Sequence, residues 1–253
     1  MSVKIYCGDC RDVVPTLGTF AFTFLDPPFG IGQDYRGYAD VGGGQLREEL
    51  LPEAIATCWE ATDGVMALHG PDHLVGIYLR EAERLGMRRV GWVIWHYRFG
   101  QCGRGNWIHS HEHCLLYATH RDHTWNPEAV LVPSDRAAVY GDRRVDDYAN
   151  GGQRLPFTVW GVAGDGDADY WGRVQGNSKE RRAGHPNQLP EVYVARLVRA
   201  YTNPGDRILD AFAGSGTLAT VAHALGRSCV AVDVSPESCR SIAARVKAGA
   251  VRV

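Results

Sequence analysis

The chain has 253 residues, and its 27 Lys and Arg against 29 Asp and Glu give a formal net charge of −2 with the ten His neutral. This balance excludes a generally basic nucleic-acid-coating protein, so any contact with nucleic acid must come from a local basic patch. Apolar residues make up 45% of the chain and charged residues 22%, which excludes wholesale disorder, and no apolar run approaches the ~18 residues of a membrane span.

The first half of the chain alternates short apolar strands with helices. Strands are predicted at 3–6, 20–25, 65–68, 90–95 and 114–117, and helices at about 46–59 and 72–85. The run 20–25 is continuously apolar, as is typical of a strand buried on both faces, and it ends where two prolines, Pro27 and Pro28, cannot donate to a strand ladder. In the helix at 72–85 we expect Arg80, Glu81 and Arg84 on the solvated face.

The second half begins with a weak pattern and then becomes regular again. From Thr119 to about Gly184, Gly, Asp and Arg dominate, so we interpret residues 120–184 as a loop-rich insertion. Beyond it, the pattern predicts a helix at about 189–201, a strand at 207–210, a loop and helix at 214–225, a strand at 229–232 and a helix at 236–246 with Ser235 as its N-cap. This alternation predicts an α/β fold, a parallel sheet covered by helices on both faces.

A glycine-rich turn follows the strand predicted at 207–210 and opens a helix. Glycines let the backbone approach a ligand closely, and ligands of open α/β sheets bind beyond the carboxyl ends of the strands. Asp210 ends this strand and Asp233 ends the next one, where its carboxylate is placed to accept hydrogen bonds from ribose hydroxyls. Since Asp210 would repel a pyrophosphate, we expect a nucleoside that carries a cation, S-adenosylmethionine. The alternative is a turn whose glycines serve packing alone.

A second chemically suggestive group is Asp26-Pro27-Pro28-Phe29. An exocyclic amino group needs two acceptors in one plane, and the Asp26 carboxylate and the Pro27 carbonyl can supply them. Phe29 offers a flat face on which a base can stack. Alternatively, Asp-Pro simply starts a turn and Phe29 belongs to the core.

Together and in this order, the two motifs resemble those of amino-group DNA methyltransferases of the permuted β class. In that family a catalytic D-P-P-[YFW] precedes a cofactor loop F-x-G-x-G-T. Further similar segments are YCGDC at 6–10, HEHCLLY at 111–117, VPSDR at 132–136 followed by Tyr140, Asp142 and Arg144, HPNQLP at 185–190 and LDAFAGSGT at 209–217. The chain departs from the family pattern at Leu189, where Lys is usual, at Ala211 in place of Pro, and at Gly30 in place of Asn.

The resemblance implies a Rossmann-like methyltransferase fold with a mostly parallel twisted sheet, helices on both faces and a circularly permuted motif order. It divides the chain into a catalytic half at 1–119, a target-recognition insertion at 120–184 and a cofactor-binding half at 185–253. The implied activity is methyl transfer from S-adenosylmethionine to the N6 amino group of a flipped-out adenine in double-stranded DNA, in a restriction–modification system or as a solitary methylase. Adenine is preferred because Asp in the first motif position is commoner among the adenine enzymes of the family.

Three other functions stay open as alternatives. They are methylation of cytosine N4, methylation of an amino group in RNA or protein, and a non-catalytic DNA-binding module. Members of the family often pair, so a homodimer is also an open alternative.

The resemblance also assigns residues to roles. The expected catalytic residues are Asp26, Pro27, Pro28 and Phe29. Those expected to bind S-adenosylmethionine are Asp9, Cys10, Asp26, His185, Asn187, Gln188, Asp210, Phe212, Gly214, Ser215, Gly216, Thr217 and Asp233. Those expected to contact DNA are Tyr35, Arg36, Ser134, Arg136, Tyr140, Arg143, Arg144 and Arg154.

Two patterns suggest metal or redox chemistry only weakly. Cys7 and Cys10 form a lone C-x-x-C pair, and the seven scattered Cys are typical of reduced thiols in a cytoplasmic protein. His109, His111 and His113 would share one face of a strand, but no carboxylate or Cys ligand is fixed by spacing, so we expect no metal.

Overall fold

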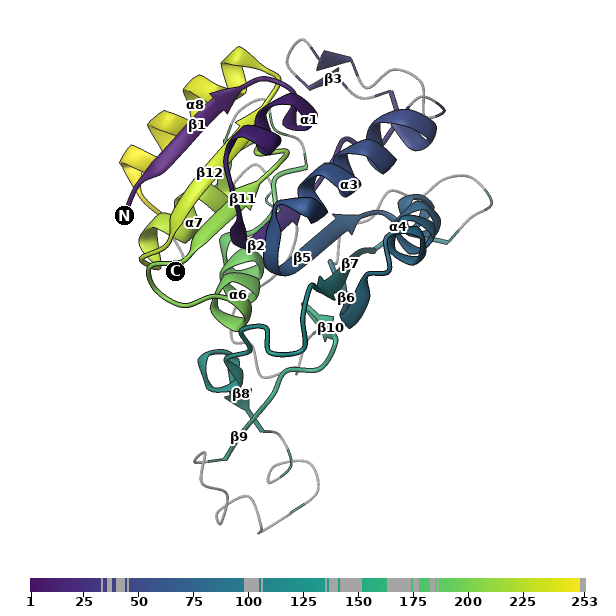
Figure 1. The fold of residues 1–253 in the computed structure, drawn as a ribbon. Helices are drawn as coiled ribbons and strands as arrows, with labels where there is room; N and C mark the ends of the chain where they lie inside the picture. Colours follow the sequence, from purple (N-terminus) through teal and green to yellow (C-terminus); the bar gives the residue numbers. More distant parts are fainter. Residues whose placement is uncertain are drawn as a thin grey trace.

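The computed structural model describes residues 1–32, 34–35, 38–39, 44, 46–97, 105, 107–134, 136, 141, 152–162, 174, 178–182, 185 and 187–250. Its centre is an eight-stranded sheet in the order β1-β12-β11-β2-β5-β7-β6-β10 (Figure 1). These strands are β1 (Val3–Cys7), β2 (Phe20–Leu25), β5 (Thr62–Gly70), β6 (Arg88–His96), β7 (His111–Ala118), β10 (Val159–Trp160), β11 (Arg207–Asp210) and β12 (Ser228–Asp233). The sheet is parallel except for β7, which runs antiparallel to both of its neighbours.

Helices cover both faces of the sheet. One face carries α6 (Glu191–Tyr201), α7 (Thr217–Ala224) and α8 (Pro236–Ala248), and the other carries α1 (Cys10–Val13), α3 (Leu51–Glu60) and α4 (Asp72–Arg84). Short helical turns are η1 (Val14–Thr16), the π-helical η2 (Leu46–Leu50) and η3 (Pro127–Val130). Two small antiparallel pairs complete the described elements, β3 (Asp34–Tyr35) with β4 (Tyr38–Ala39), and β8 (Val132–Pro133) with β9 (Gln153–Arg154). The predicted α/β fold is confirmed.

Strand β2 lies at the centre of the core, as its apolar run predicts. Phe22 and Phe24 belong to the cluster on the side of α6 and α7. Phe20 and Leu25 belong to the cluster on the side of α3 and α4. All four are at most 2% exposed, so the strand contributes large apolar side chains to both layers of the molecule.

The chain leaves the two central strands in opposite directions. From β11 it passes through α7 to β12 on one side, whereas from β2 it passes through α3 to β5 on the other side. Since β11 and β2 are parallel neighbours, their carboxyl ends form the topological switch point at which open α/β sheets bind ligands.

Two expectations about local structure have clear outcomes. Ser235 is the N-cap of α8, as predicted, and its hydroxyl accepts a hydrogen bond from the Ser238 amide. The expectation that Glu81 is solvated is wrong: Glu81 is 3% exposed and accepts hydrogen bonds from the side chains of Arg80 and Arg84. The two arginines cover and neutralise this carboxylate, which explains its low exposure.

Residues 120–184 contribute to the main sheet. β10 lies in this range and pairs with β6 in parallel, with Trp160 opposite Trp95. Trp160 is 6% exposed and belongs to the core cluster beside α6. In Figure 1, by contrast, β8 and β9 project away from the sheet. None of the described helices is long and apolar enough to cross a membrane.

Any side chain at Gly64 should destabilise the protein, because a Cβ at this position would lie 2.1 Å from the Ala21 carbonyl oxygen of the neighbouring strand. We expect Gly64→Ala to lower the free energy of unfolding by ~1–3 kcal/mol or more, because two backbones must separate. Gly76→Ala is the matched control: Gly76 lies in α4 with open space around it, so that variant should be at least as stable as the wild type. Equilibrium urea unfolding measures both, and equal behaviour of the two variants would contradict the prediction.

Candidate active site

A cavity of about 280 Å³ lies at the carboxyl ends of the central strands. The predicted catalytic segment and the predicted cofactor loop, which are far apart in the sequence, both line it. Its wall includes Asp9, Cys10, Asp26, Pro27, Pro28, Phe29, His185, Asn187, Gln188, Asp210, Phe212, Gly214, Ser215, Thr217 and Asp233. The structure therefore brings together the two motifs on which the sequence interpretation depends.

Asp26 directly follows β2, and its side chain lines the cavity. Its Oδ1 is sealed from bulk solvent and has no hydrogen-bond partner among the described residues. Burial raises the pKa of Asp26 to about 7; the charge of His69 acts against this rise, and that of Glu112 adds to it. A buried acceptor without a donor is costly, which favours a site that receives a donor from a ligand.

Phe29 forms part of the cavity wall and is also a core residue. Its ring is 7% exposed and belongs to the cluster beneath α3 and α4. The backbone after it is fixed by α4, because His73 Nε2 lies 2.6 Å from the Phe29 carbonyl oxygen. Gly30 then adopts a φ of 71°, a left-handed conformation that both Gly and Asn tolerate, so this departure from the family pattern preserves the turn.

Asp210 and Asp233 are the acidic ends of two adjacent strands. Asp210 is 3% exposed, and burial, together with the charges of Asp26 and Asp233, raises its pKa well above the usual value. Burial also raises the pKa of Asp233, whose two oxygens accept hydrogen bonds from the Gly214 and Ser235 amides at 2.8 Å each. Asp233 thus joins the cofactor loop to the start of α8, while a carboxylate keeps further lone pairs for a ligand.

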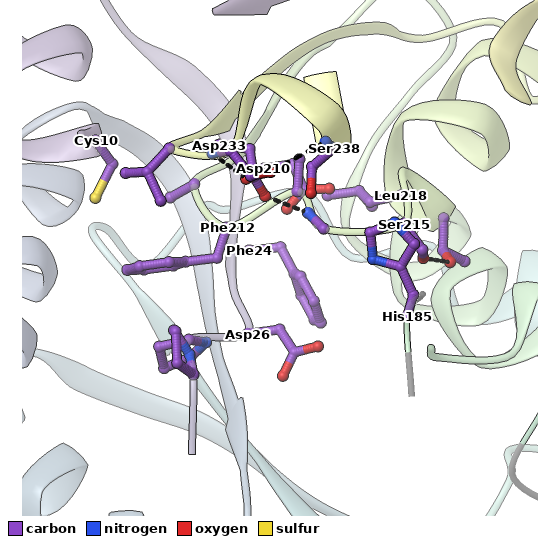
Figure 2. A pocket seen from close by; sticks show the side chains of 18 of the residues that line it. Cys10, Phe24, Asp26, His185, Asp210, Phe212, Ser215, Leu218, Asp233 and Ser238 are labelled. Carbon is purple, nitrogen blue, oxygen red and sulfur yellow. Dashed lines mark hydrogen bonds between the residues drawn. The ribbon is translucent and has the colours of Figure 1, made fainter. Parts of the chain in front are cut away.

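The three carboxylates of Asp26, Asp210 and Asp233 line the same cavity. None of them has an ion-pair partner in the part of the chain that the structure describes, and Figure 2 shows all three beside the same space. Buried charges are normally paired, so this arrangement suits a ligand that brings positive charge and hydrogen-bond donors. The residues present therefore fit a nucleoside with a cationic group, as expected from the sequence.

The glycines of the predicted cofactor loop have different tasks. Gly214 lines the cavity with a φ of 46°. Gly216 does not line it: it precedes α7 with a φ of 73°, and a Cβ there would lie 3.0 Å from the Ile242 side chain. The structure does not place Gly216 among the residues that face a ligand; its lack of a side chain allows α8 to pack closely against the loop.

The remaining residues expected to bind the cofactor differ in how free their side chains are. Asp9 caps α1 and forms an ion pair with Arg11 at 2.7 Å, so this carboxylate is already neutralised. Gln188 accepts a hydrogen bond from the Arg182 amide and donates one to the Glu180 carbonyl, which ties down the chain before α6. Leu189, in the place of the family Lys, is 5% exposed and lines the cavity.

The sequence did not predict Phe24 and His69 at the site. Phe24 stands around the cavity in Figure 2 together with Asp26 and with Phe212, which was predicted. Phe24 lies two residues before Asp26, and strand alternation places both on one face, a signal that was available in the sequence. His69, buried next to Asp26 at the end of β5, was also missed; a histidine that follows the apolar run 65–68 was the only sign of it.

The residues expected to contact DNA are described only in part. Arg36, Tyr140, Arg143 and Arg144 lie outside the described residues, and of Tyr35 only its place in β3 is described. Ser134 and the exposed Arg136 follow β8, with the Ser134 amide bonded to the Gly152 carbonyl. Arg154 lies in β9 with its guanidinium 4.0 Å from the centre of the Phe157 ring. These three therefore gather around the projecting β8–β9 pair.

The three alternating histidines lie side by side without a metal-binding arrangement among the described residues. The ring centres of His109 and His111 are 5.3 Å apart, and those of His111 and His113 are 5.1 Å apart. Trp92 donates a hydrogen bond to His113, which gives this row a packing role beside β6.

Comparison with known proteins supports one family. A family model described as a DNA methylase, N6_N4_Mtase, matches residues 20–245. The type II methyltransferase M1.MboII of Moraxella bovis is 30% identical over 92% of each protein. The DNA adenine methyltransferase YhdJ of Escherichia coli strain K12 is 26% identical over 85% of this chain and 71% of YhdJ. Among solved structures, the cytosine-N4-specific PvuII DNA methyltransferase has the same fold, with a TM-score of 0.69 and 13% identity over 97% of this chain and 86% of that one.

The raised pKa of Asp26 predicts that the contribution of this residue to the stability of the protein without ligand is lost as the pH rises from about 4 through about 7. Over this range the folded state keeps a proton that the unfolded chain has released, so stability is full below the unfolded pKa and is lost through the folded pKa. Asp26→Asn removes this ionisation, and we expect the variant to be more stable than the wild type at pH 8 and equal to it near pH 4. Urea unfolding across this pH range measures the difference.

Glu81→Gln is the matched control, since neighbouring arginines lower the pKa of Glu81. The contribution of Glu81 to stability is present above its unfolded pKa, so this variant should be less stable than the wild type at pH 8. A loss of stability at pH 8 in Asp26→Asn as well would contradict the assignment of Asp26.

Proposed function

The chain belongs to the N6/N4 DNA methylase family, and on this premise we propose that it methylates the N6 amino group of a flipped-out adenine in double-stranded DNA. It is a DNA methyltransferase, and S-adenosylmethionine is its cofactor. Asp in the first position of the catalytic motif favours adenine over cytosine N4. The similarity to YhdJ, a DNA adenine methyltransferase, supports the same choice.

The observation that carries the proposal is the unpartnered oxygen of Asp26 in the cavity. This carboxylate follows β2 and is succeeded by Pro27, whose carbonyl is the second acceptor in the proposal. An exocyclic amino group has two N–H donors, which matches a pair of neighbouring acceptors. A proline at this position cannot offer a donor of its own, so the corner presents acceptors to the base.

The cofactor fits the cavity through the acidic ends of β11 and β12. In the proposal Asp210 faces its cationic part and Asp233 accepts hydrogen bonds from its hydroxyl groups, with Phe212 and the loop at Gly214 forming the adjoining wall. When bound, S-adenosylmethionine supplies a methyl group activated by a sulfonium, so no nucleophile of the protein is required. The task of the protein is to orient the attacking nitrogen and to stabilise the charge that develops on it.

Asp26 has three roles in this mechanism. An aryl amine is a weak nucleophile because its lone pair is delocalised into the ring; acceptance of both N–H groups by Asp26 and Pro27 lets the nitrogen pyramidalise. As positive charge develops on nitrogen, the buried carboxylate stabilises it. With a pKa of about 7, Asp26 is also suited to take up the proton that the methylated nitrogen must release.

DNA recognition is assigned to the insertion at 120–184 and to the segment that follows Phe29. A base inside a duplex cannot reach a buried carboxylate, so the target base must leave the stack, at a cost of a few kcal/mol. Phe29, held in the cavity wall, offers a ring to the flipped base. Ser134, Arg136 and Arg154 at the projecting β8–β9 pair are the described residues proposed to contact the duplex.

Replacing Asp26 with Ala should leave cofactor binding nearly intact and lower methyl transfer by roughly two orders of magnitude or more, since a preorganised electrostatic contact is lost. Calorimetry measures cofactor affinity, and incorporation of tritiated methyl groups into duplex DNA measures turnover. Asp12→Ala, at an exposed carboxylate in α1, is the control and should keep the wild-type rate. A near-normal rate in Asp26→Ala would rule out the catalytic role.

The choice of adenine predicts that DNA from cells that make the protein contains N6-methyladenine. Digestion to nucleosides followed by mass spectrometry separates this product from N4-methylcytosine. N4-methylcytosine would replace adenine by cytosine as the target, and methyl groups found only in RNA or protein would overturn DNA as the substrate.

A further inference from the structure

A row of buried polar side chains runs from the catalytic carboxylate into the sheet. The register of β2 and β5 ends with Leu25 opposite Leu68, and Asp26 and His69 are the residues that directly follow this pair, close enough for their charges to interact. β5 in turn pairs His69 with Cys114 of β7, and Glu112 lies two residues away on the same face. The row faces α6, and the catalytic carboxylate is its end at the cavity.

His69 is held on both sides of its ring. Its Nε2 lies 3.0 Å from Glu112 Oε2, and its Nδ1 lies 3.0 Å from the Tyr193 hydroxyl. His69 is fully buried and Glu112 is 4% exposed, so neither side chain is free to turn toward solvent. Because Glu112 accepts a hydrogen bond, Nε2 carries a proton, and a second proton on Nδ1 can be donated to the Tyr193 oxygen.

The surroundings favour the charged form of His69. Burial alone would lower its pKa, but Cys114, Glu112 and Asp26 act against burial and raise the pKa to about 10. The titratable groups that face His69 or Asp26 are Tyr78 (α4), Glu112 and Cys114 (β7), Tyr193 (α6) and Asp210 (β11). Burial raises the pKa of both tyrosines, so they are neutral near pH 7 and the charges that remain belong to His69 and the carboxylates.

A buried ion pair is weak evidence for stability, since apolar side chains of similar volume often serve equally well. An apolar side chain would suit the position of His69, because the His69 ring packs against the rings of Phe24 and Trp95. The presence of the charged His69–Glu112 pair in these apolar surroundings is therefore better explained by an effect on Asp26, its neighbour in the cavity. Placed beside Asp26, an imidazolium favours the ionised carboxylate, while Glu112 alone would oppose ionisation.

We propose that His69 and Glu112 are positioning residues that act through Asp26: the imidazolium of His69 keeps the catalytic carboxylate ionised, and Glu112 holds that imidazolium in place. This inference rests on the proposed function, because an ionised Asp26 matters to the reaction only if the carboxylate receives an amino group. Neither residue is assigned contact with the base or the cofactor.

The test compares wild type, His69→Gln and the double variant His69→Gln/Glu112→Gln. The first readout is the pH dependence of kcat/KM for methyl transfer. Removing the imidazolium should move the acid limb of this profile to higher pH by about one pH unit, which means an approximately tenfold loss at pH 6 and little loss at pH 9. The double variant also lacks the Glu112 carboxylate, which the single variant leaves without its partner. Its acid limb should therefore lie at a higher pH than that of the wild type and at a pH no higher than that of the single variant.

The second readout does not depend on activity. The carboxyl carbon of Asp26, assigned by its loss in Asp26→Asn, is titrated by ¹³C NMR in the protein without cofactor or DNA. The pH at the midpoint of this titration should be lowest in the wild type and higher in both variants, as expected for the acid limb. Tyr193→Phe is the matched control: it removes a contact of the same ring without removing a charge, so both readouts should stay near the wild-type values.

The outcomes separate the two proposals. If the Asp26 midpoint rises in both variants but DNA is not methylated by the wild type, the electrostatic inference stands and the proposed function fails. If the wild type methylates DNA but its acid limb and its Asp26 midpoint are unchanged in the variants, the inference is wrong. Should His69→Gln fail to fold, the double variant, with two neutral amides in place of the ion pair, provides the test. An Asp26 midpoint above that of the wild type supports the inference, and an unchanged midpoint contradicts it.

Discussion

The site depends on three carboxylates, one buried and two partly buried, that meet at one edge of a sheet and form no ion pair within the described residues. Asp26, Asp210 and Asp233 meet there because β2, β11 and β12 are parallel and adjacent, so their carboxyl ends coincide. Each is held by short-range structure: a pair of prolines after one, and backbone amides at the other two. Low-dielectric surroundings strengthen the attraction of such groups for an incoming cation or donor and make them unfavourable in its absence. The same arrangement therefore provides affinity and limits the stability of the empty protein.

The helices and strands were predictable wherever the signal is local. The strand 20–25 has the predicted bounds because an apolar run is stopped by prolines. The strand 207–210 has them because it ends in an acid, Asp210, and a glycine-rich turn follows. The reversed direction of β7 could not be predicted, since alternation along a strand contains no information about its partner's direction. β10 was missed because two residues are too few to show a period, although they extend the main sheet.

The same distinction applies to the site. Residues at strand ends, such as Asp26 and Asp210, were predicted together because topology brings the ends of parallel strands to one place. Phe24 could have been found from its spacing to Asp26, whereas the place of His69 depends on the pairing of β2 with β5, which is a long-range property. Gly216 was assigned to ligand binding on the strength of its motif, but the structure gives its space to Ile242 of a distant helix.

The pairing of β2 with β11 also has a consequence for how the protein is made. Phe22 and Ile208 are partners in the centre of the sheet, yet they lie far apart in the sequence, so the ribosome delivers Ile208 long after Phe22. Until the later strand emerges, the nascent chain exposes one edge of its most apolar strand, and such an unpaired edge invites association with other chains. A fold whose central contact forms late is expected to fold slowly and to benefit from protection by chaperones, because its contacts span long stretches of sequence.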